Sequence, residues 1–329
     1  MNKDFWKDQQ AKWKMCFLAP MDGYWDSAYR QSMRRVAPHV ICISEFYSAD
    51  GLVHSKFLAD SVLPHQSIED PLIIQIFGKD PEMFAKAAEI ISQSKYNIAG
   101  IDVNMWCPAK KVVRSGHGSS LLINSDTAFD IIRALDKATD LPISVKTRRS
   151  FDGNQNLLDF GGWLEKAGAR LLTIHWRTAK QAYTWVADHT DTRALKQHLS
   201  IPVICNWDII SYDDGMEKVW ELDGFMIGRA SFGNPWCFTP GWYNPTLNEM
   251  LEAMEFHATQ LVATKWERKW SLEIRKHLVQ YLKHFPWVKA YRKELVTTES
   301  LENSLNVIHN IKTEFKNDLE KRPGLWEIE

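Results

Sequence analysis

The sequence predicts an α/β fold, a barrel of eight parallel strands alternating with helices (a (β/α)8, or TIM, barrel), followed by a C-terminal helical domain. Two observations predict it. Short, continuously apolar runs recur through the first 230 residues, as expected of strands buried on both faces, and amphipathic stretches separate them. Beyond residue 240 only helical periodicity remains. An open, doubly wound sheet is the alternative that the same alternation allows.

The predicted elements follow from this pattern in chain order. The eight strands are the apolar, β-branched runs 15–19, 40–46, 72–77, 101–105, 143–147, 171–175, 203–205 and 225–227. The clearest helices between them are 81–92, 125–138 and 157–167. From 248 to about 317 the pattern is helical and charged, with a single proline, Pro286. We therefore expect an N-terminal extension (1–13), a barrel (14–240) and a helical domain (241–329).

Composition excludes several classes of protein. Lys and Arg (40) nearly balance Asp and Glu (41), so a nucleic-acid partner would need local basic patches. The five cysteines lie far apart without a CxxC pair, which disfavours both a disulfide framework and a metal site. The chain begins with charged residues, and no apolar run reaches 18 residues. We expect a cytoplasmic monomer without a signal peptide or a membrane span.

Polar side chains gather where the predicted strands end, the face on which barrel enzymes build their active sites. The charged and amide residues at these ends are Asp22, Gln75, Asn104, Lys146, Arg148, His175, Arg177, Asn206, Asp208 and Arg229. Lys146 ends a buried strand, where an unpaired ammonium is costly, so it predicts either an anionic ligand or a salt bridge across the barrel mouth. Gly228 and Arg229 follow the last strand, a usual place for a phosphate.

Cys107 differs from the other cysteines in its surroundings. It follows the fourth strand, precedes a proline and opens a loop that contains Lys110, Lys111, Arg114 and two glycines. A mobile, positively charged surround favours a reactive sulfur over an inert one. The remaining cysteines are expected to be apolar filling.

Seven segments identify a resemblance from about Lys14 to Phe238. They are APMDG (19–23), QIFG (75–78), DVNMWCPAKKVVRSGHG (102–118), VKTR (145–148), TIHWRT (173–178), CNWDI (205–209) and MIGRASFGNPW (226–236), and they resemble the tRNA-dihydrouridine synthase family. The resemblance implies that NADPH reduces bound FMN, that reduced flavin passes a hydride to C6 of a tRNA uridine, and that Cys107 protonates C5.

The resemblance also implies the residues of the site. Those implied to hold FMN are Pro20, Met21, Asp22, Gln75, Lys146, His175, Asn206, Trp207, Asp208, Gly228 and Arg229. Those implied to bind tRNA are Asn104, Lys110, Lys111, Arg114, Arg148 and Arg177. The basic residues Lys265, Arg268, Lys269, Arg275 and Lys276 of the helical domain are either a second tRNA contact or a solvated face. A flavin barrel acting on free pyrimidines is a neighbouring alternative, which these basic residues disfavour.

Tryptophan stands at seven positions where the family usually has glycine, namely Trp106, Trp176, Trp185, Trp207, Trp266, Trp270 and Trp287. An indole blocks the close approach that glycine permits. Two interpretations remain open: a degenerate paralogue that lost flavin and kept tRNA binding, or UGA codons that the source organism reads as glycine. The 16 glycines in 329 residues are about 5%, whereas about 7% is usual. Seven more glycines would restore the usual fraction, which favours UGA codons read as glycine. Other positions where the family usually has glycine hold Ala182, Cys205 and Ala230. This mixture of residue types favours the degenerate paralogue.

Overall fold

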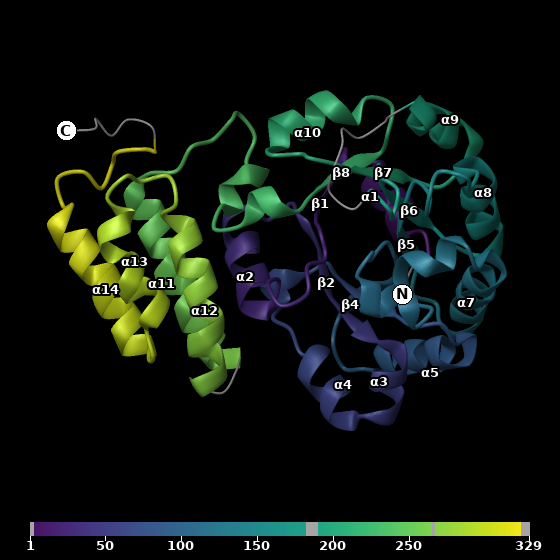
Figure 1. Ribbon diagram of the computed structural model, residues 1–329, viewed down its shortest axis with the longest axis horizontal. Helices are drawn as coiled ribbons and strands as arrows, with labels where there is room; N and C mark the ends of the chain where they lie inside the picture. The colour runs from purple at the N-terminus through teal and green to yellow at the C-terminus, as the bar shows by residue number, and fades with distance from the viewer. Residues whose placement is uncertain (1–2, 182–189, 265–266, 324–329) are drawn as a thin grey trace. The chain divides into compact units, whose positions relative to one another are not determined.

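Eight parallel strands form a closed barrel in chain order in the computed structural model, which describes residues 3–181, 190–264 and 267–323 (Figure 1). The strands are β1 (Met15–Leu18), β2 (Ile41–Ser48), β3 (Leu72–Phe77), β4 (Ile98–Met105), β5 (Ile143–Arg148), β6 (Leu171–His175), β7 (Val203–Asn206) and β8 (Gly224–Ile227). The last strand pairs with the first, with Met15 opposite Gly224. The predicted barrel is confirmed, and this closing pair excludes the open sheet.

Helices connect the strands, and those predicted over 81–92, 125–138 and 157–167 are present at these bounds. They are α2 (Ser27–Val36), α3 (Ala49–His54), α4 (Lys56–Val62), α5 (Pro81–Ser92), α6 (Lys110–Arg114), α7 (Ser125–Ala138), α8 (Leu157–Ala167), α9 (Thr190–His198) and α10 (Tyr212–Val219). Helix α5 begins at its predicted residue because the Asp80 side chain accepts from the Glu82 N–H and Pro81 occupies the first turn. Helix α8 ends at Gly168, where a Cβ would lie 2.6 Å from Asp136.

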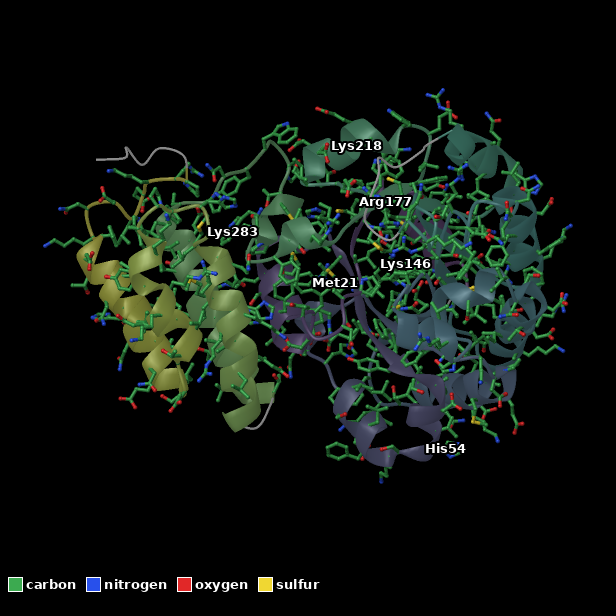
Figure 2. The ribbon with its side chains drawn as sticks, in the orientation of Figure 1. Met21, His54, Lys146, Arg177, Lys218 and Lys283 are labelled. Carbon is green, nitrogen blue, oxygen red and sulfur yellow. The ribbon has the colours of Figure 1, made fainter. Side chains whose placement is uncertain are left out.

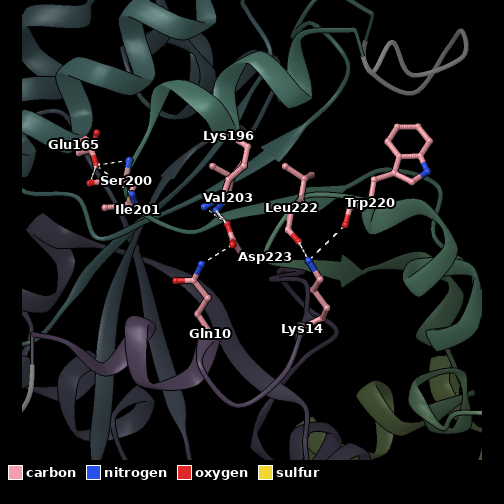
Figure 3. A network of polar contacts seen from close by, with 10 residues as sticks. All are labelled: Gln10, Lys14, Glu165, Lys196, Ser200, Ile201, Val203, Trp220, Leu222 and Asp223. Carbon is pink, nitrogen blue, oxygen red and sulfur yellow. Dashed lines mark hydrogen bonds and ion pairs between the residues drawn. The ribbon is translucent and has the colours of Figure 1, made fainter.

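The N-terminal segment belongs to the barrel. Helix α1 (Phe5–Gln10) buries Trp6, which is 1% exposed and packs with Phe17 in the barrel interior, their ring centroids 5.8 Å apart. Gln10 donates to Asp223 at 2.6 Å (Figure 3). Because Asp223 directly precedes β8, α1 lies at the amino ends of the strands, opposite the face where the site is predicted.

The chain divides into two compact units. The barrel unit holds residues 1–22, 41–209 and 214–228, and the helical unit holds 23–40, 210–213 and 229–329. The helical unit contains α11 (Leu247–Thr264), α12 (Glu267–Tyr281), α13 (Val288–Thr297) and α14 (Leu301–Glu314), as its periodicity predicted. Residues 23–40 join it because Ala28 of α2 packs into the core of these helices. The domain limits drawn from sequence, 14–240 and 241–329, stay a prediction. In the described ranges no helix is long and apolar enough to cross a membrane.

Candidate active site at the carboxyl ends of the strands

A chain of hydrogen bonds between buried side chains crosses three strands and ends at Cys107. Ser144 on β5 donates to the Asp102 carboxylate on β4 (2.6 Å), and Gln75 Nε2 on β3 donates to the same carboxylate (2.6 Å). Asn104 Nδ2 donates to Gln75 Oε1 (3.0 Å), and Asn104 Oδ1 accepts the backbone N–H of Cys107 (3.2 Å). The strand pairing produces this chain, because Gln75 lies opposite Asp102 and Asp102 lies opposite Ser144.

The backbone N–H of Cys107 fixes the direction of the bonds that Asn104 and Gln75 make. A backbone amide can only donate, so Asn104 must turn its oxygen to Cys107 and its nitrogen to Gln75. Gln75 must then turn its own nitrogen to Asp102, which accepts it. The carboxylate is thus the acceptor that holds both amides in orientation. Sequence reasoning missed Asp102, although a lone carboxylate within an apolar strand is itself a signal of a buried partner.

Burial raises the pKa of Asp102 to about 6, although Ser144, Gln75 and Lys146 favour its charged form. Because this pKa lies above that of the unfolded chain, the folded state holds the proton more tightly. The free energy of unfolding therefore falls as pH rises from about 4 to about 6, by on the order of 3 kcal/mol.

In Asp102→Asn this fall should disappear. Asparagine can accept from Gln75 and donate to the hydroxyl oxygen of Ser144, so it keeps the hydrogen bonds without a charge. Urea denaturation at pH 4 and pH 7 measures the difference in the free energy of unfolding. The control is Asp60→Asn, which changes an exposed acid and should keep the difference of the unaltered chain. If the free energy of unfolding of Asp102→Asn still fell between pH 4 and pH 7, the raised pKa could not be assigned to Asp102.

Cys107 is a buried thiol that keeps its proton. It is 9% exposed, and burial raises its pKa, against the lowering effect of Arg148 and Lys146. This suits a proton donor better than a thiolate nucleophile. Gly118 lies against it with φ of 60°, and a Cβ there would lie 2.9 Å from the Cys107 carbonyl oxygen, so the loop needs glycine at this point. The other four cysteines are buried.

The positive charge near Cys107 comes from strand residues. Arg148 and Lys146 of β5 act on the thiol, whereas Arg114 of the loop is exposed. Lys110 and Lys111 lie in α6, but their side chains are outside the described part of the structure. The tRNA contacts predicted for these loop residues stay a prediction.

Lys146, labelled in Figure 2, is fully buried within the barrel unit, and its Nζ has no hydrogen-bond partner among the described residues. It lies instead 3.7 Å from the ring centroid of Trp106. Burial, with a smaller contribution from Arg148, holds the pKa of Lys146 well below its usual range. Of the two partners that the sequence allowed, a salt bridge does not form among the described residues, and the anionic ligand stays a prediction.

Two pairs of aromatic rings lie at the carboxyl ends of β4, β6 and β7. The Trp106 ring is nearly parallel to the His175 ring, at 27° with centroids 6.3 Å apart. Trp176 is 1% exposed, and its ring centroid lies 6.0 Å from that of Trp207. The indole N–H groups of Trp106 and Trp176 are buried and have no hydrogen-bond partner in the described part of the chain, and each such group costs roughly 1–3 kcal/mol.

Three predicted residues already have partners within the barrel unit. Arg177 is 4% exposed and binds the Asp208 carboxylate through both terminal nitrogens, one at 3.3 Å. Arg148 is fully buried and donates to the Trp106 carbonyl oxygen at 2.8 Å. Asn206 donates to the Met226 carbonyl oxygen at 3.0 Å. These contacts hold the strand ends together, and the ligand roles assigned to these residues stay a prediction.

The ends of β1 and β8 lie side by side, as a phosphate site between them would require. A Cβ on Gly228 would lie 3.6 Å from the Ala19 side chain and 4.0 Å from the Met21 sulfur. Pro20 is buried, Met21 is half-buried, and Asp22 and Arg229 are exposed. Trp185, Trp266, Ala182 and Lys265 lie outside the described residues, as do the side chains of Arg268, Lys269 and Trp270.

The residues as they stand do not fit a flavin. The resemblance places the flavin against Lys146 and His175, but the Trp106 indole covers the lysine and lies parallel to the histidine. The space over the Lys146 ammonium is thus taken by the indole, whose ring centroid lies 3.7 Å from Nζ.

Comparisons with known proteins show the family of the chain. The family model for dihydrouridine synthase (Dus) matches residues 17–317. The probable tRNA-dihydrouridine synthase 1 of Synechocystis sp. is 34% identical over 303 residues, covering 88% of this chain and 84% of that protein. The tRNA-dihydrouridine synthase B of Pseudomonas putida is 31% identical, with 93% and 94% covered.

Solved structures show the fold alone. A 2-naphthoyl-CoA reductase complex superposes with a TM-score of 0.51 at 13% identity, covering 68% of this chain and 49% of that one. The family itself follows from the sequence matches, which span most of the chain and include β4 with Cys107 at its end. The chain belongs to the dihydrouridine synthase family.

Proposed function

We propose that the protein reduces the C5–C6 double bond of a uridine in tRNA, with Cys107 as the proton donor to C5. The observation that carries the proposal is a buried thiol of raised pKa at the carboxyl end of a barrel strand, within a family match over residues 17–317. Reduction of this bond needs a proton as well as a hydride, so the donor must hold its proton at neutral pH. Asn104, held by Gln75 and Asp102, fixes the backbone that carries the thiol.

A basic pocket in the helical unit supports an RNA partner. It encloses about 470 Å³, and its described lining includes Arg229, Arg275, Lys276, Lys283 and Arg292. The aromatic rings of Tyr24 and Phe232 lie in the same pocket, with centroids 4.6 Å apart. Clustered cations neutralise phosphates, and aromatic side chains stack with unpaired bases. Of the two alternatives for Arg275 and Lys276, this favours a tRNA contact over a solvated face.

Whether FMN can be proposed as the cofactor depends on which residue stands at position 106. FMN, with NADPH as reductant, is what the family resemblance implies, but the residues present do not accommodate it. We therefore propose FMN and NADPH only for a form of the protein with an open site, and derive no step through either. For that form we propose a cytoplasmic monomer acting on tRNA.

Expression in a bacterial strain without its own dihydrouridine synthases tests the function. Two versions are compared: the chain as written, and a chain with glycine at the seven tryptophan positions that the resemblance identified. We expect dihydrouridine in the tRNA of the second strain and none in the first. Purified protein that reduces free uracil without tRNA would favour the free-pyrimidine alternative. A glycine version that binds flavin but leaves tRNA unmodified would contradict the proposal.

A further inference from the structure

Two tryptophans have backbone conformations that favour glycine. Trp220 has φ of 44° and Trp242 has φ of 51°, and Asp208 (28°) is the other non-glycine residue with positive φ in the described ranges. Aspartate tolerates this left-handed region, whereas bulky residues there are outliers. With 15 tryptophans in 329 residues, about one residue in 22 is tryptophan, so two among three left-handed residues are not expected by chance.

Trp220 takes the usual place of a helix-ending glycine. It directly follows Val219, the last residue of α10, where helices commonly place a left-handed glycine. Lys14 donates to the carbonyl oxygens of Trp220 (3.4 Å) and Leu222 (2.5 Å), which holds the turn in place (Figure 3). The side chain is 48% exposed, and its ring centroid lies 6.4 Å from that of Trp207 and 5.7 Å from the Arg193 guanidinium carbon.

Trp242 is the second of two successive left-handed residues. Gly241 before it has φ of 84°. The N–H groups of both donate to the Asp213 carboxylate, at 3.1 Å and 2.6 Å. Turns with two successive positive φ values favour pairs such as Asn-Gly and Gly-Gly. The Trp242 side chain is 56% exposed.

At position 106 the argument for glycine rests on the space that the Trp106 indole occupies, not on backbone conformation. The indole covers the buried ammonium of Lys146, and its own N–H is buried with no acceptor within residues 3–181, 190–264 and 267–323. Neither Trp220 nor Trp242 is among the seven positions that the family resemblance selects. Backbone geometry therefore selects tryptophans independently of the resemblance.

We propose that Trp106, Trp220 and Trp242 occupy positions built for glycine, and that glycine at position 106 opens the cofactor site over Lys146. The part that concerns Trp106 rests on the proposed function, whereas the part that concerns Trp220 and Trp242 rests on backbone geometry alone. Codons that the source organism reads as glycine produce this pattern. A decaying gene has no reason to place one residue type at left-handed positions.

Glycine and alanine variants at one position test the backbone part. At position 220, glycine should melt higher than alanine, by roughly 2–4 °C, because only alanine keeps the left-handed penalty of a Cβ. The matched control is Trp163, also 48% exposed but inside α8, where glycine should melt lower than alanine. Alanine at 220 melting as high as glycine would overturn this part.

Flavin titration tests the part at position 106. The protein with Trp106→Gly should quench FMN fluorescence on binding, whereas the chain as written and Trp163→Gly should not. A stabilising glycine at 220 without FMN binding by Trp106→Gly would overturn the cofactor proposal and leave the backbone inference standing. FMN binding by the chain as written would overturn the claim that Trp106 closes the site.

The gene offers a third, independent readout. We expect UGA at codons 106, 220 and 242, and UGG at codon 6, because Trp6 is packed in the barrel interior. UGG at codons 106, 220 and 242 would overturn the codon explanation.

Discussion

Alanine at position 107, in the protein with glycine at position 106, should slow uridine reduction by roughly 10²–10⁴-fold. In the proposed reaction the thiol supplies the proton for C5, and burial keeps that proton on sulfur at neutral pH by raising the pKa of Cys107. Single-turnover formation of dihydrouridine in tRNA measures the effect. Cys42→Ala is the matched control, because Cys42 is a fully buried cysteine of β2.

Binding measurements separate a chemical role of Cys107 from a structural one. FMN affinity and tRNA affinity should be the same in Cys107→Ala and its parent, because the thiol is proposed to act in the chemical step alone. A rate within a few-fold of the parent would mean that another group or water donates the proton. Weaker FMN binding in Cys107→Ala would point to a positioning role for the loop instead.

Trp6→Ala should lower the free energy of unfolding of the barrel unit by about 3–5 kcal/mol. The indole is 1% exposed and packs against Phe17 in the barrel interior, so its removal leaves a cavity. Trp13→Ala is the control: that side chain is 51% exposed, and its loss should change stability by about 0.5 kcal/mol or less. Urea denaturation compares the two, and equal losses would contradict the assignment of α1 to the barrel.

The strands and several helices could be predicted from local patterns. The continuous apolar runs became β3 and β6 at their predicted bounds, because burial on both faces removes the polar alternation of a surface strand. Helix α5 begins where Asp80 and Pro81 provide local start signals. Such signals lie within a few residues of the element that they determine.

Features that depend on distant contacts could not be predicted. The role of Asp102 depends on strand register, which places it opposite Gln75 and Ser144. The grouping of α2 with the helical unit depends on the packing of Ala28 among the C-terminal helices. Likewise, the strained backbone of Trp220 becomes visible only once the end of α10 is placed.

The structure bears on the two interpretations that the sequence left open. Loss of flavin binding by gradual decay would leave a mixture of residue types at former glycines, as Ala182, Cys205 and Ala230 would represent. Trp220 and Trp242 instead add two tryptophans to the seven, at positions chosen by backbone conformation. This favours codons read as glycine, and with them a working enzyme.

The mass of tRNA after reaction with purified protein tests the central claim most directly. Unmodified tRNA is incubated with NADPH, FMN and either the chain as written or the chain with glycine at the seven positions and at 220 and 242. We predict that only the glycine form adds two hydrogens to a uridine, and that its Cys107→Ala variant adds them far more slowly. A glycine form that binds FMN and tRNA yet leaves the mass unchanged would contradict the account.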